Sequence, residues 1–200
     1  MQYPKAFVIT KEMLKAKGPC SEGYRDFCEN YPDGVDYNEL LLACTEADRD
    51  DYAGWLLRTF GATNTTLVLV EINSERSIVF SGSIICKGRL ESKERIKTGK
   101  GIKAGWSIEA GRGIKAGRGI EAGWSIEAGE GIEAGEGIKA GKGIEAGEGI
   151  KAGEGIKAGE GIKAGLDYGI YAGLSVRISQ KSRCAKISAK IKPINIICGE

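Results

Sequence analysis

The feature that most constrains this chain of 200 residues is an aliphatic residue at every sixth position over nearly half of its length. The series runs from Ile72 to Ile162, and each of its sixteen members is isoleucine except Leu90. Most units follow the order Ile, Lys or Glu, Ala, Gly, a variable residue, and then Gly or Ser. A fixed period of this kind is typical of repeat architectures. We therefore expect a repeat fold and not a disordered low-complexity coil.

Each six-residue unit predicts one short strand followed by one turn. Side chains alternate along a strand, so Ile and Ala of a unit face one side and Lys or Glu faces the other. The Gly-x-Gly that follows supplies a permissive backbone for a corner. One such strand cannot bury its Ile face alone, so successive units are expected to stack into a solenoid with an interior of Ile and Ala.

The spacing of two tryptophans favours three units per coil. Trp106 and Trp124 are separated by three units, and each lies within the string GWSIEA. Stacking every third unit places the two indoles one above the other, about 4.8 Å apart, whereas a coil of two units places them on opposite faces. From Lys97 to Lys163, stacking every third unit gives five opposite-charge pairs against four like-charge pairs, and stacking every second unit gives four against six. We therefore predict a triangular coil. Duplication of a three-unit segment is an alternative origin of the same 18-residue spacing.

The segment before the repeat, residues 1–61, carries the signals of short helices. A residue able to cap a helix precedes each expected helix, at Thr10, Ser21, Asp36 and Thr45. The expected helices cover residues 11–17, 22–30, 37–44 and 46–60. Their apolar residues recur at helical spacing and predict a packed core, so no binding site is assigned to them. These residues are Met13, Leu14, Tyr24, Phe27, Leu40, Leu41, Tyr52, Trp55, Leu56, Leu57 and Phe60.

From Thr65 onward the chain has the pattern of β-structure, beginning with the β-branched runs TTLVLVEI and SIVFSGSII. The repeat is interrupted at residues 166–168, after which GIYAGLSVRIS and KISAKIKPINII resume as alternating strands that we expect to cover the open end of the solenoid. We therefore predict an α+β protein with three parts. They are a helical module at 1–64, a single-chain parallel β-solenoid at 65–178 and a basic C-terminal β cap at 179–200.

The units that begin with IKAGWS at Ile102 resemble the hexapeptide repeats of left-handed parallel β-helices. With the short helical module in front, the chain resembles repeat proteins of bacteriophages and enterobacterial prophages. One feature departs from the hexapeptide pattern, which usually has a small residue four positions after the aliphatic one. Here the small residues lie two, three and five positions after it. The resemblance implies a phage or prophage protein that works inside a bacterial host cell.

The composition argues against catalysis. Enzymes with hexapeptide β-helices are mostly acyltransferases that use a histidine base, and this chain contains no histidine. Its repeat carboxylates are expected on a solvated row, where nothing favours their use as a general base. Its six cysteines form no CxxC pair and have no histidine to activate them. We expect no enzymatic activity, no cofactor and no metal.

Charge and hydropathy limit the cellular location and the kinds of partner that we expect. Residues 1–80 hold thirteen Asp or Glu against eight Lys or Arg, and residues 166–200 hold two against six. The chain opens without the pattern of a signal peptide, and no apolar run approaches the roughly 20 residues of a membrane span. We expect a cytoplasmic protein with free thiols and no membrane contact. The basic end and the early basic units leave nucleic acid as a weak candidate partner.

Recognition by a rigid rod remains as the function. The candidate binding residues occupy the variable corner position of their units, and they are Trp106, Trp124, Arg112, Arg118, Glu130 and Glu136. Exposed tryptophans are enriched at binding hot spots, whereas the charged positions also fit a solvated face kept soluble by mixed charge. We predict a non-catalytic scaffold that binds a bacterial host protein, for instance as an antagonist of a defence enzyme. The alternative is a structural protein that assembles with itself into a homo-oligomer.

Overall fold

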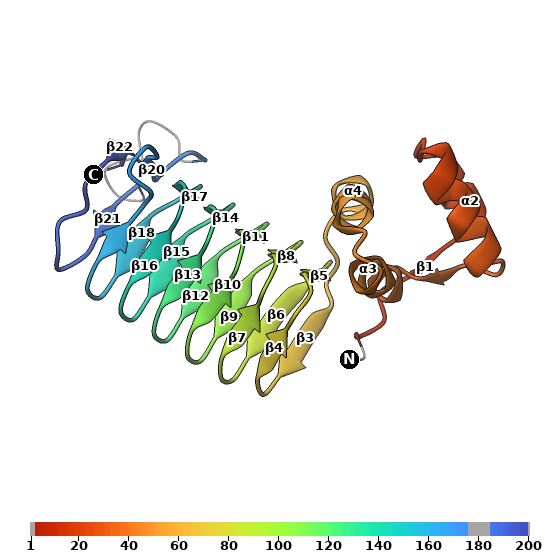
Figure 1. The fold of residues 1–200 in the computed structure, drawn as a ribbon, viewed down its shortest axis with the longest axis horizontal. Coiled ribbons are helices and arrows are strands. Elements are labelled where there is room, and N and C mark those ends of the chain that lie inside the picture. Colours follow the sequence, from red (N-terminus) through yellow and green to blue (C-terminus); the bar gives the residue numbers. More distant parts are fainter. Residues whose placement is uncertain (1–2, 176–184, 200) are drawn as a thin grey trace.

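The computed structural model describes residues 3–175 and 185–199, which form a small helical module followed by a parallel β-solenoid (Figure 1). The helices are α1 (Lys11–Lys15), α2 (Ser21–Asn30), α3 (Tyr37–Glu46) and α4 (Asp50–Phe60). A short antiparallel ladder of β1 (Val8–Ile9) and β2 (Val35–Asp36) connects the two helix pairs. This architecture confirms the predicted α+β class.

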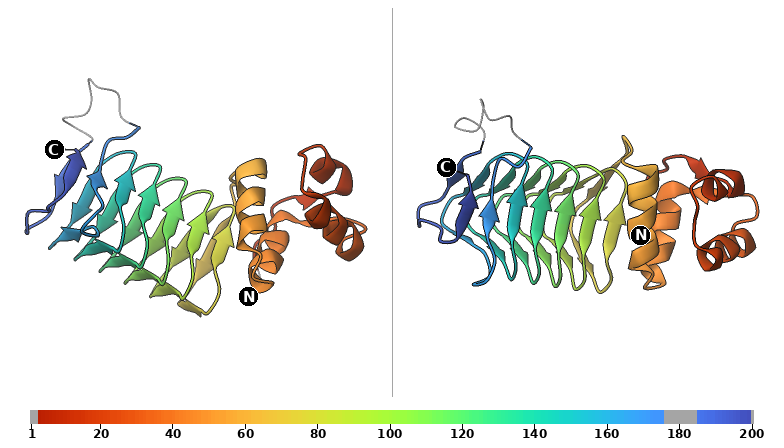
Figure 2. Two further views of the ribbon diagram at one scale, coloured as in Figure 1. Left: turned by 45° about the horizontal axis from the view of Figure 1, so that its top comes forward. Right: turned by 90° about the horizontal axis from the view of Figure 1, so that it is seen from above.

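Three parallel sheets form the sides of the solenoid (Figure 2). Sheet 1 contains β3 (Thr66–Leu69), β6 (Ser83–Cys86), β9 (Ile102–Ala104), β12 (Ile120–Ala122), β15 (Ile138–Ala140), β18 (Ile156–Ala158) and β21 (Ile187–Ser188). Sheet 2 contains β4 (Ile72–Ser74), β7 (Leu90–Ser92), β10 (Ile108–Ala110), β13 (Ile126–Ala128), β16 (Ile144–Ala146) and β19 (Ile162–Lys163). Sheet 3 contains β5 (Ile78–Phe80), β8 (Ile96–Thr98), β11 (Ile114–Ala116), β14 (Ile132–Ala134), β17 (Ile150–Ala152), β20 (Ile170–Tyr171) and β22 (Ile196–Cys198).

Successive strands belong to successive sheets, so three six-residue units complete one coil. In the ladder between β10 and β13, Ile108 lies beside Ile126 and Ala110 lies beside Ala128, so the strands that pair are three units apart. This register confirms the predicted triangular coil. It also places the side chains of one unit directly over those of the matching unit in the preceding coil.

Isoleucine and alanine fill the interior of the solenoid. Ile108 and Ile126 are fully buried, and Ala110 and Ala128 are nearly so. Burying an isoleucine side chain contributes roughly 1.5–3 kcal/mol, and the repeat supplies such a residue on every strand of each coil. From the unit at Leu90 to the unit at Ile162, the outward residue is Lys or Glu, so the alternation of one strand separates the core from the solvent.

The glycine after each alanine is required because the coils stack closely there. A Cβ atom on Gly111 would lie closer than 3.0 Å to the carbonyl oxygen of Lys93, and one on Gly129 would lie as close to that of Gly111. Cβ atoms do not approach backbone oxygens to that distance, so the coil with a larger residue would have to move. The turn thus selects glycine for its small size.

The second glycine of the turn is under less constraint. A Cβ atom on Gly113 would lie 3.4 Å from the carbonyl oxygen of Gly131, an ordinary contact. Serine takes this place at Ser107 and Ser125. The expectation that the repeat glycines permit an unusual φ is wrong, since positive φ among the described glycines is confined to Gly18, Gly34, Gly61, Gly173 and Gly199.

Two of the four predicted helix caps are confirmed. The Thr10 side chain accepts a hydrogen bond from the Met13 N–H, and the Asp36 carboxylate accepts from two N–H groups at the start of α3. Side chains in these positions satisfy backbone donors that the helix leaves open. The prediction for α2 is wrong by one residue, because Ser21 is the first helical residue and Cys20 is its N-cap.

The predicted start of the last helix at residue 46 is also wrong. Helix α3 continues to Glu46, and Thr45 lies buried inside it with its hydroxyl donating to the Leu42 carbonyl at 2.9 Å. A threonine bonded to the preceding turn fits within a helix as well as at a cap. The chain turns at Asp48, where φ is 56°, and α4 begins at Asp50.

Helices α3 and α4 lie against the first coil and cover the N-terminal end of the solenoid (Figure 1). The Ser81 hydroxyl donates to the Asn38 side-chain oxygen at 2.5 Å. Tyr3 packs edge-on against Phe80, with ring centroids 5.2 Å apart. These contacts cover an edge that would otherwise be open to pairing with another chain.

At the opposite end, two inserted residues increase the sequence separation between the residues that pair. Ile150 lies beside Ile170, two positions beyond the regular repeat, and β21 and β22 extend sheets 1 and 3 in parallel. The predicted strand GIYAGLSVRIS is described as far as Ser175, and the predicted domain boundary at 178 lies outside the described residues. Several apolar side chains are exposed near this end, namely Leu166, Leu174, Ile191, Ile194 and Ile197.

Candidate functional site

The tryptophans Trp106 and Trp124, which we call the aromatic step, occupy one corner of the solenoid. Their rings stack with centroids 5.6 Å apart and planes 10° from parallel. The Trp124 N–H donates to the Trp106 carbonyl at 3.0 Å, and the neighbouring hydroxyls of Ser107 and Ser125 lie 3.1 Å apart. The predicted stacking of the two indoles is therefore confirmed. Its cause is the coil of three units, which repeats each corner directly above the last.

The aromatic step is solvent-exposed, and charged residues follow it along the same corner. Trp106 and Trp124 are 53% and 49% exposed. The Lys142 ammonium lies 4.8 Å from the centre of the Trp124 ring, on the side away from Trp106, and Glu160 follows Lys142 at the same corner. A cation over an indole face is attracted by the ring quadrupole. This corner thus presents a pair of stacked, half-exposed rings with a positive charge beside them.

The predicted binding residues Arg112 and Glu130 lie together on a second corner. The Arg112 Nε atom is 2.8 Å from Glu130 Oε1, and Arg112 also reaches Glu94 at 3.5 Å. The hydrogen bond to Glu130 raises the pKa of Arg112, and Arg112 in turn lowers the pKa of Glu130. Arg95 adds a further contact to Glu130 at 3.2 Å. These side chains neutralise one another at this corner.

The remaining predicted residues, Arg118 and Glu136, lie on the third corner. Arg118 Nε and Glu136 Oε1 are 3.9 Å apart, and both side chains are largely exposed. The structure therefore distributes the six predicted residues over three corners in pairs and does not gather them into one site. The spacing of each charged pair is also three units, so the register that stacks the tryptophans would have predicted these ion pairs from the sequence.

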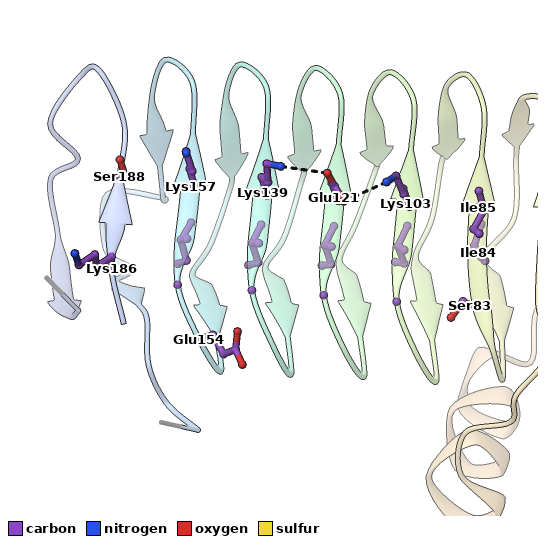
Figure 3. A pocket seen from close by; sticks show the side chains of 18 residues that line it. Ser83, Ile84, Ile85, Lys103, Glu121, Lys139, Glu154, Lys157, Lys186 and Ser188 are labelled. Carbon is purple, nitrogen blue, oxygen red and sulfur yellow. Dashed lines mark hydrogen bonds and ion pairs between the residues drawn. The ribbon is translucent and has the colours of Figure 1, made fainter. Parts of the chain in front are cut away.

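Sheet 1 presents a row of charged side chains along its outer face (Figure 3). Glu121 lies between Lys103 and Lys139, at 3.5 and 3.3 Å from their ammonium groups. Burial alone would raise the pKa of Glu121, but the two lysines lower it. Lys157 follows Lys139 in the same row, so the positive charge increases toward β21. The row is flat and mostly paired, as expected of a solvated face.

A groove in the helical module is a candidate that the sequence did not reveal. It lies between α2 and α4 with α3 as its floor, and it encloses about 490 Å³. Its apolar lining consists of Leu14, Phe27, Tyr31, Leu40, Cys44, Tyr52 and Trp55. The prediction that Tyr24, Tyr52, Trp55 and Phe60 are core is only half right, because they are half-buried, and Met13 is 39% exposed. Helical spacing identifies the inward face of each helix but not the distance between the helix pairs.

Two cysteine thiols, those of Cys44 and Cys86, lie in surroundings that disfavour their reactive form. Burial raises the pKa of the Cys44 thiol to about 11, and burial also raises that of Cys86. A nucleophilic cysteine needs the opposite shift. Among the described residues, no group of three or more His, Cys, Asp or Glu is arranged to hold a metal ion. No helix in this part of the chain has the length and apolar character needed to cross a membrane.

The comparisons with known proteins concern the helical module. Residues 1–61 match the family model described as the YdhT N-terminal domain, and the match ends at Gly61, the C-cap of α4. No curated protein and no solved structure matches the chain. With the parallel solenoid that follows, the match fits a hexapeptide-repeat-like protein that carries a distinct N-terminal module.

Proposed function

We propose that this protein is a non-catalytic scaffold that binds another protein through the aromatic step. The observation that carries the proposal is the half-exposed stack of Trp106 on Trp124. Large aromatic side chains dominate the energy of protein interfaces because they bury much apolar area at a low cost in side-chain entropy. The exposed surface of this pair is therefore suited to the centre of an interface.

The corner that carries the aromatic step is rigid, which supports a binding role. Backbone hydrogen bonds of 3.1, 3.0 and 2.8 Å join Gly88, Trp106, Trp124 and Lys142 in sequence along this corner. A side chain held in place before binding loses less freedom when the partner arrives. Lys142 beside the rings favours a partner with an acidic group near an apolar one.

The proposal extends to origin and target. A phage- or prophage-encoded protein would act on a protein of its bacterial host, for instance by antagonising a defence enzyme in the cytoplasm. The resemblance of the hexapeptide units and the short helical module to phage repeat proteins supports this extension. The match of residues 1–61 to the YdhT N-terminal domain agrees with the helical module being a unit of its own.

Affinity capture from a bacterial lysate tests the binding role. The full chain would be compared with Trp106→Ala/Trp124→Ala and with Arg118→Ala/Glu136→Ala, which alters another corner of the same coils. We expect a protein that the intact chain and the Arg118/Glu136 variant retain and that the tryptophan variant releases. Retention of the same proteins by all three chains would remove the aromatic step from the interface.

Self-assembly is the second candidate, and the exposed apolar side chains near the C-terminal end favour it. Leu166, Ile191, Ile194 and Ile197 are each more than half exposed, and clustered exposed apolar residues mark association surfaces. Light scattering across a range of protein concentrations measures this directly. A molar mass that stays at one chain at every concentration would contradict self-assembly.

Nucleic-acid binding receives less support than either. Arg112 and Arg118, the most prominent basic residues of the early units, are paired with glutamates on the same corners. Cations that are already paired release fewer counterions when they meet phosphates. Absence of salt-sensitive binding to DNA or RNA would exclude this function.

A further inference from the structure

A hollow lies where α4 meets the outer face of sheet 3, and Val79 of β5 belongs to its lining. Figure 1 shows α4 beside β5. Helix α4 contributes Asp50, Asp51, Gly54 and Arg58 to its lining. Sheet 3 contributes Lys97 from β8 and Lys115 from β11, and Arg95 lies just before β8. Four cationic side chains from two parts of the molecule thus line one end of a single hollow.

Two of these cations point to the same spot beside Gly54. A Cβ atom built on Gly54 would lie 3.4 Å from Lys97 Nζ and 3.5 Å from Arg58 Nη1. Gly54 itself is buried, whereas Arg58 is exposed. The absence of a side chain at Gly54 leaves room for one atom, such as a phosphate oxygen, in contact with both cations.

The same two cations lack carboxylate partners. Arg95 pairs with Glu130 at 3.2 Å, and Lys115 pairs with Glu133 at 2.8 Å. Within residues 3–175 and 185–199, neither Arg58 nor Lys97 forms an ion pair with a carboxylate. Lys97 in addition lies directly beside Lys115 in the ladder of sheet 3, an arrangement of like charges that is unfavourable without a counter-charge.

The two acidic residues of α4 that line the hollow, Asp50 and Asp51, are engaged by groups other than Arg58 and Lys97. The Asp50 carboxylate accepts a hydrogen bond from the Ser77 hydroxyl, and Asp51 lies 3.9 Å from Arg49. Burial, followed by the charges of Arg58, Lys115 and Arg95, lowers the pKa of Lys97, and these effects exceed the opposite effect of the Glu133 carboxylate. The environment of the Lys97 ammonium is therefore electropositive, and an anion in front of Gly54 would relieve it.

We propose that Arg58 and Lys97 bind a dianionic phosphoryl group in the space beside Gly54. Two uncompensated cations match the two negative charges of such a group, whereas a single carboxylate would leave one cation unpaired. The guanidinium donates in a planar fork and the ammonium acts as a point charge, a combination suited to phosphate oxygens. The phosphoryl group is free phosphate or part of a small phosphate ester. The site lies apart from the aromatic step and does not depend on its role.

Calorimetric titration of inorganic phosphate into the full chain, at constant ionic strength, tests the proposal. Lys97→Met should weaken binding at least tenfold. Lys157→Met is the matched control, because Lys157 also lies beside another lysine, Lys139, on a sheet that α4 does not cover. The control should bind phosphate like the intact chain. Equal weakening by both variants would show a general charge effect and overturn the proposal.

The variant Gly54→Ala tests whether phosphate binding can be lost while the fold is kept. Its methyl group would meet the two cations at ordinary contact distances, and alanine is a better helix former than glycine, so the variant should fold. The methyl group would fill the space meant for the anion, and phosphate binding should again fall at least tenfold. Unchanged binding in this variant would overturn the assigned position.

A second titration with glycerol phosphate distinguishes the two sources of the group. Tighter binding of the ester than of inorganic phosphate would support a ligand that carries the group, and the reverse would support free phosphate. No heat from either ligand at millimolar concentration would overturn the proposal. None of these outcomes bears on the aromatic step, which is tested by capture of a protein.

Discussion

In the helical module each stabilising contact occurs once, whereas in the solenoid the same contact recurs with every coil. The Asp36 carboxylate alone accepts hydrogen bonds from the N–H groups of Ala6, Asn38 and Glu39. In the solenoid, by contrast, the pairing of Ile108 with Ile126 has a counterpart in each neighbouring ladder. The stability of the module therefore depends on individual side chains, whereas the stability of the solenoid depends on one stacking pattern that is repeated from coil to coil. We call this pattern the stacking rule.

This difference decides how each region responds to substitution. A changed side chain in the module removes one particular contact. A residue that breaks the stacking rule affects the coil on either side, because each coil packs against the coils next to it. The predictions below test this contrast, beginning with the substitution that violates the rule most directly.

Gly129→Ala should cause the largest loss of stability. Its Cβ atom would lie closer than 3.0 Å to the carbonyl oxygen of Gly111, so the two coils would have to separate. We expect the free energy of unfolding to fall by roughly 3 kcal/mol or more, as for other severe steric changes. Urea denaturation measures it. Gly113→Ala is the control, since its Cβ atom meets nothing nearer than 3.4 Å, and a loss as large as that of Gly129→Ala would contradict the stacking argument.

Asp36→Ala should have the next largest effect. The buried carboxylate satisfies the N–H group of Ala6, just before β1, and two N–H groups at the start of α3, and the variant leaves these donors without an acceptor. A lost cap and unsatisfied buried groups together cost about 1–3 kcal/mol. Thermal unfolding would be compared with that of Asp33→Ala, which removes an exposed carboxylate from the same module. Similar melting temperatures for the two variants would contradict this role.

Alkaline pH should destabilise the module through Cys44. Burial raises the pKa of this thiol from 9.0 to about 11 in the folded protein, so the unfolded chain loses its proton first as the pH rises. The stabilisation is fully present below about pH 9 and is lost as the pH approaches 11, with a limit of roughly 2–3 kcal/mol.

Denaturant midpoints at pH 8 and pH 10.5, measured in a reducing buffer, test this linkage. Cys44→Ala should lose less stability over this interval than the intact chain. Burial also raises the pKa values of Tyr3 and Tyr37, which both chains keep, so the difference between the chains isolates the thiol.

Trp106→Ala should have the smallest effect on stability, although it removes the largest side chain of its coil. Half of the indole is exposed, so we expect a loss below about 1 kcal/mol. Ile108→Ala, two positions later in the fully buried interior, should cost about 2–5 kcal/mol. A larger loss for Trp106 than for Ile108 in urea denaturation would show that the aromatic step serves the fold and not a partner.

The sequence predicted most of the solenoid because local pattern and long-range contact coincide there. When each coil repeats the last, a residue's neighbour lies three units away, and the spacing of Trp106 and Trp124 was sufficient to predict their stacking. The same spacing joins Arg112 to Glu130, yet those charges were interpreted as a binding surface. The signal was present in the sequence and was applied only to the tryptophans.

The module and its contacts with the solenoid were less predictable. The position of Thr45 before an acidic run indicated a helix start, but its hydroxyl bonds within α3. Arg58 and Lys97 converge on Gly54 although no period relates their positions in the chain. Such contacts depend on how one element docks on another, and that information is spread over many side chains.

The equivalence of the coils makes the length of the solenoid adjustable in fixed increments. Because one coil presents the same Ile, Ala and Gly surfaces on both sides, insertion of three units after Ala128 would lengthen the rod by one strand spacing, about 4.8 Å. The aromatic step would keep its distance from the helical module. The same insertion before Trp106 would move the step away from the module by that increment, so the placement of the step and the total length can vary independently.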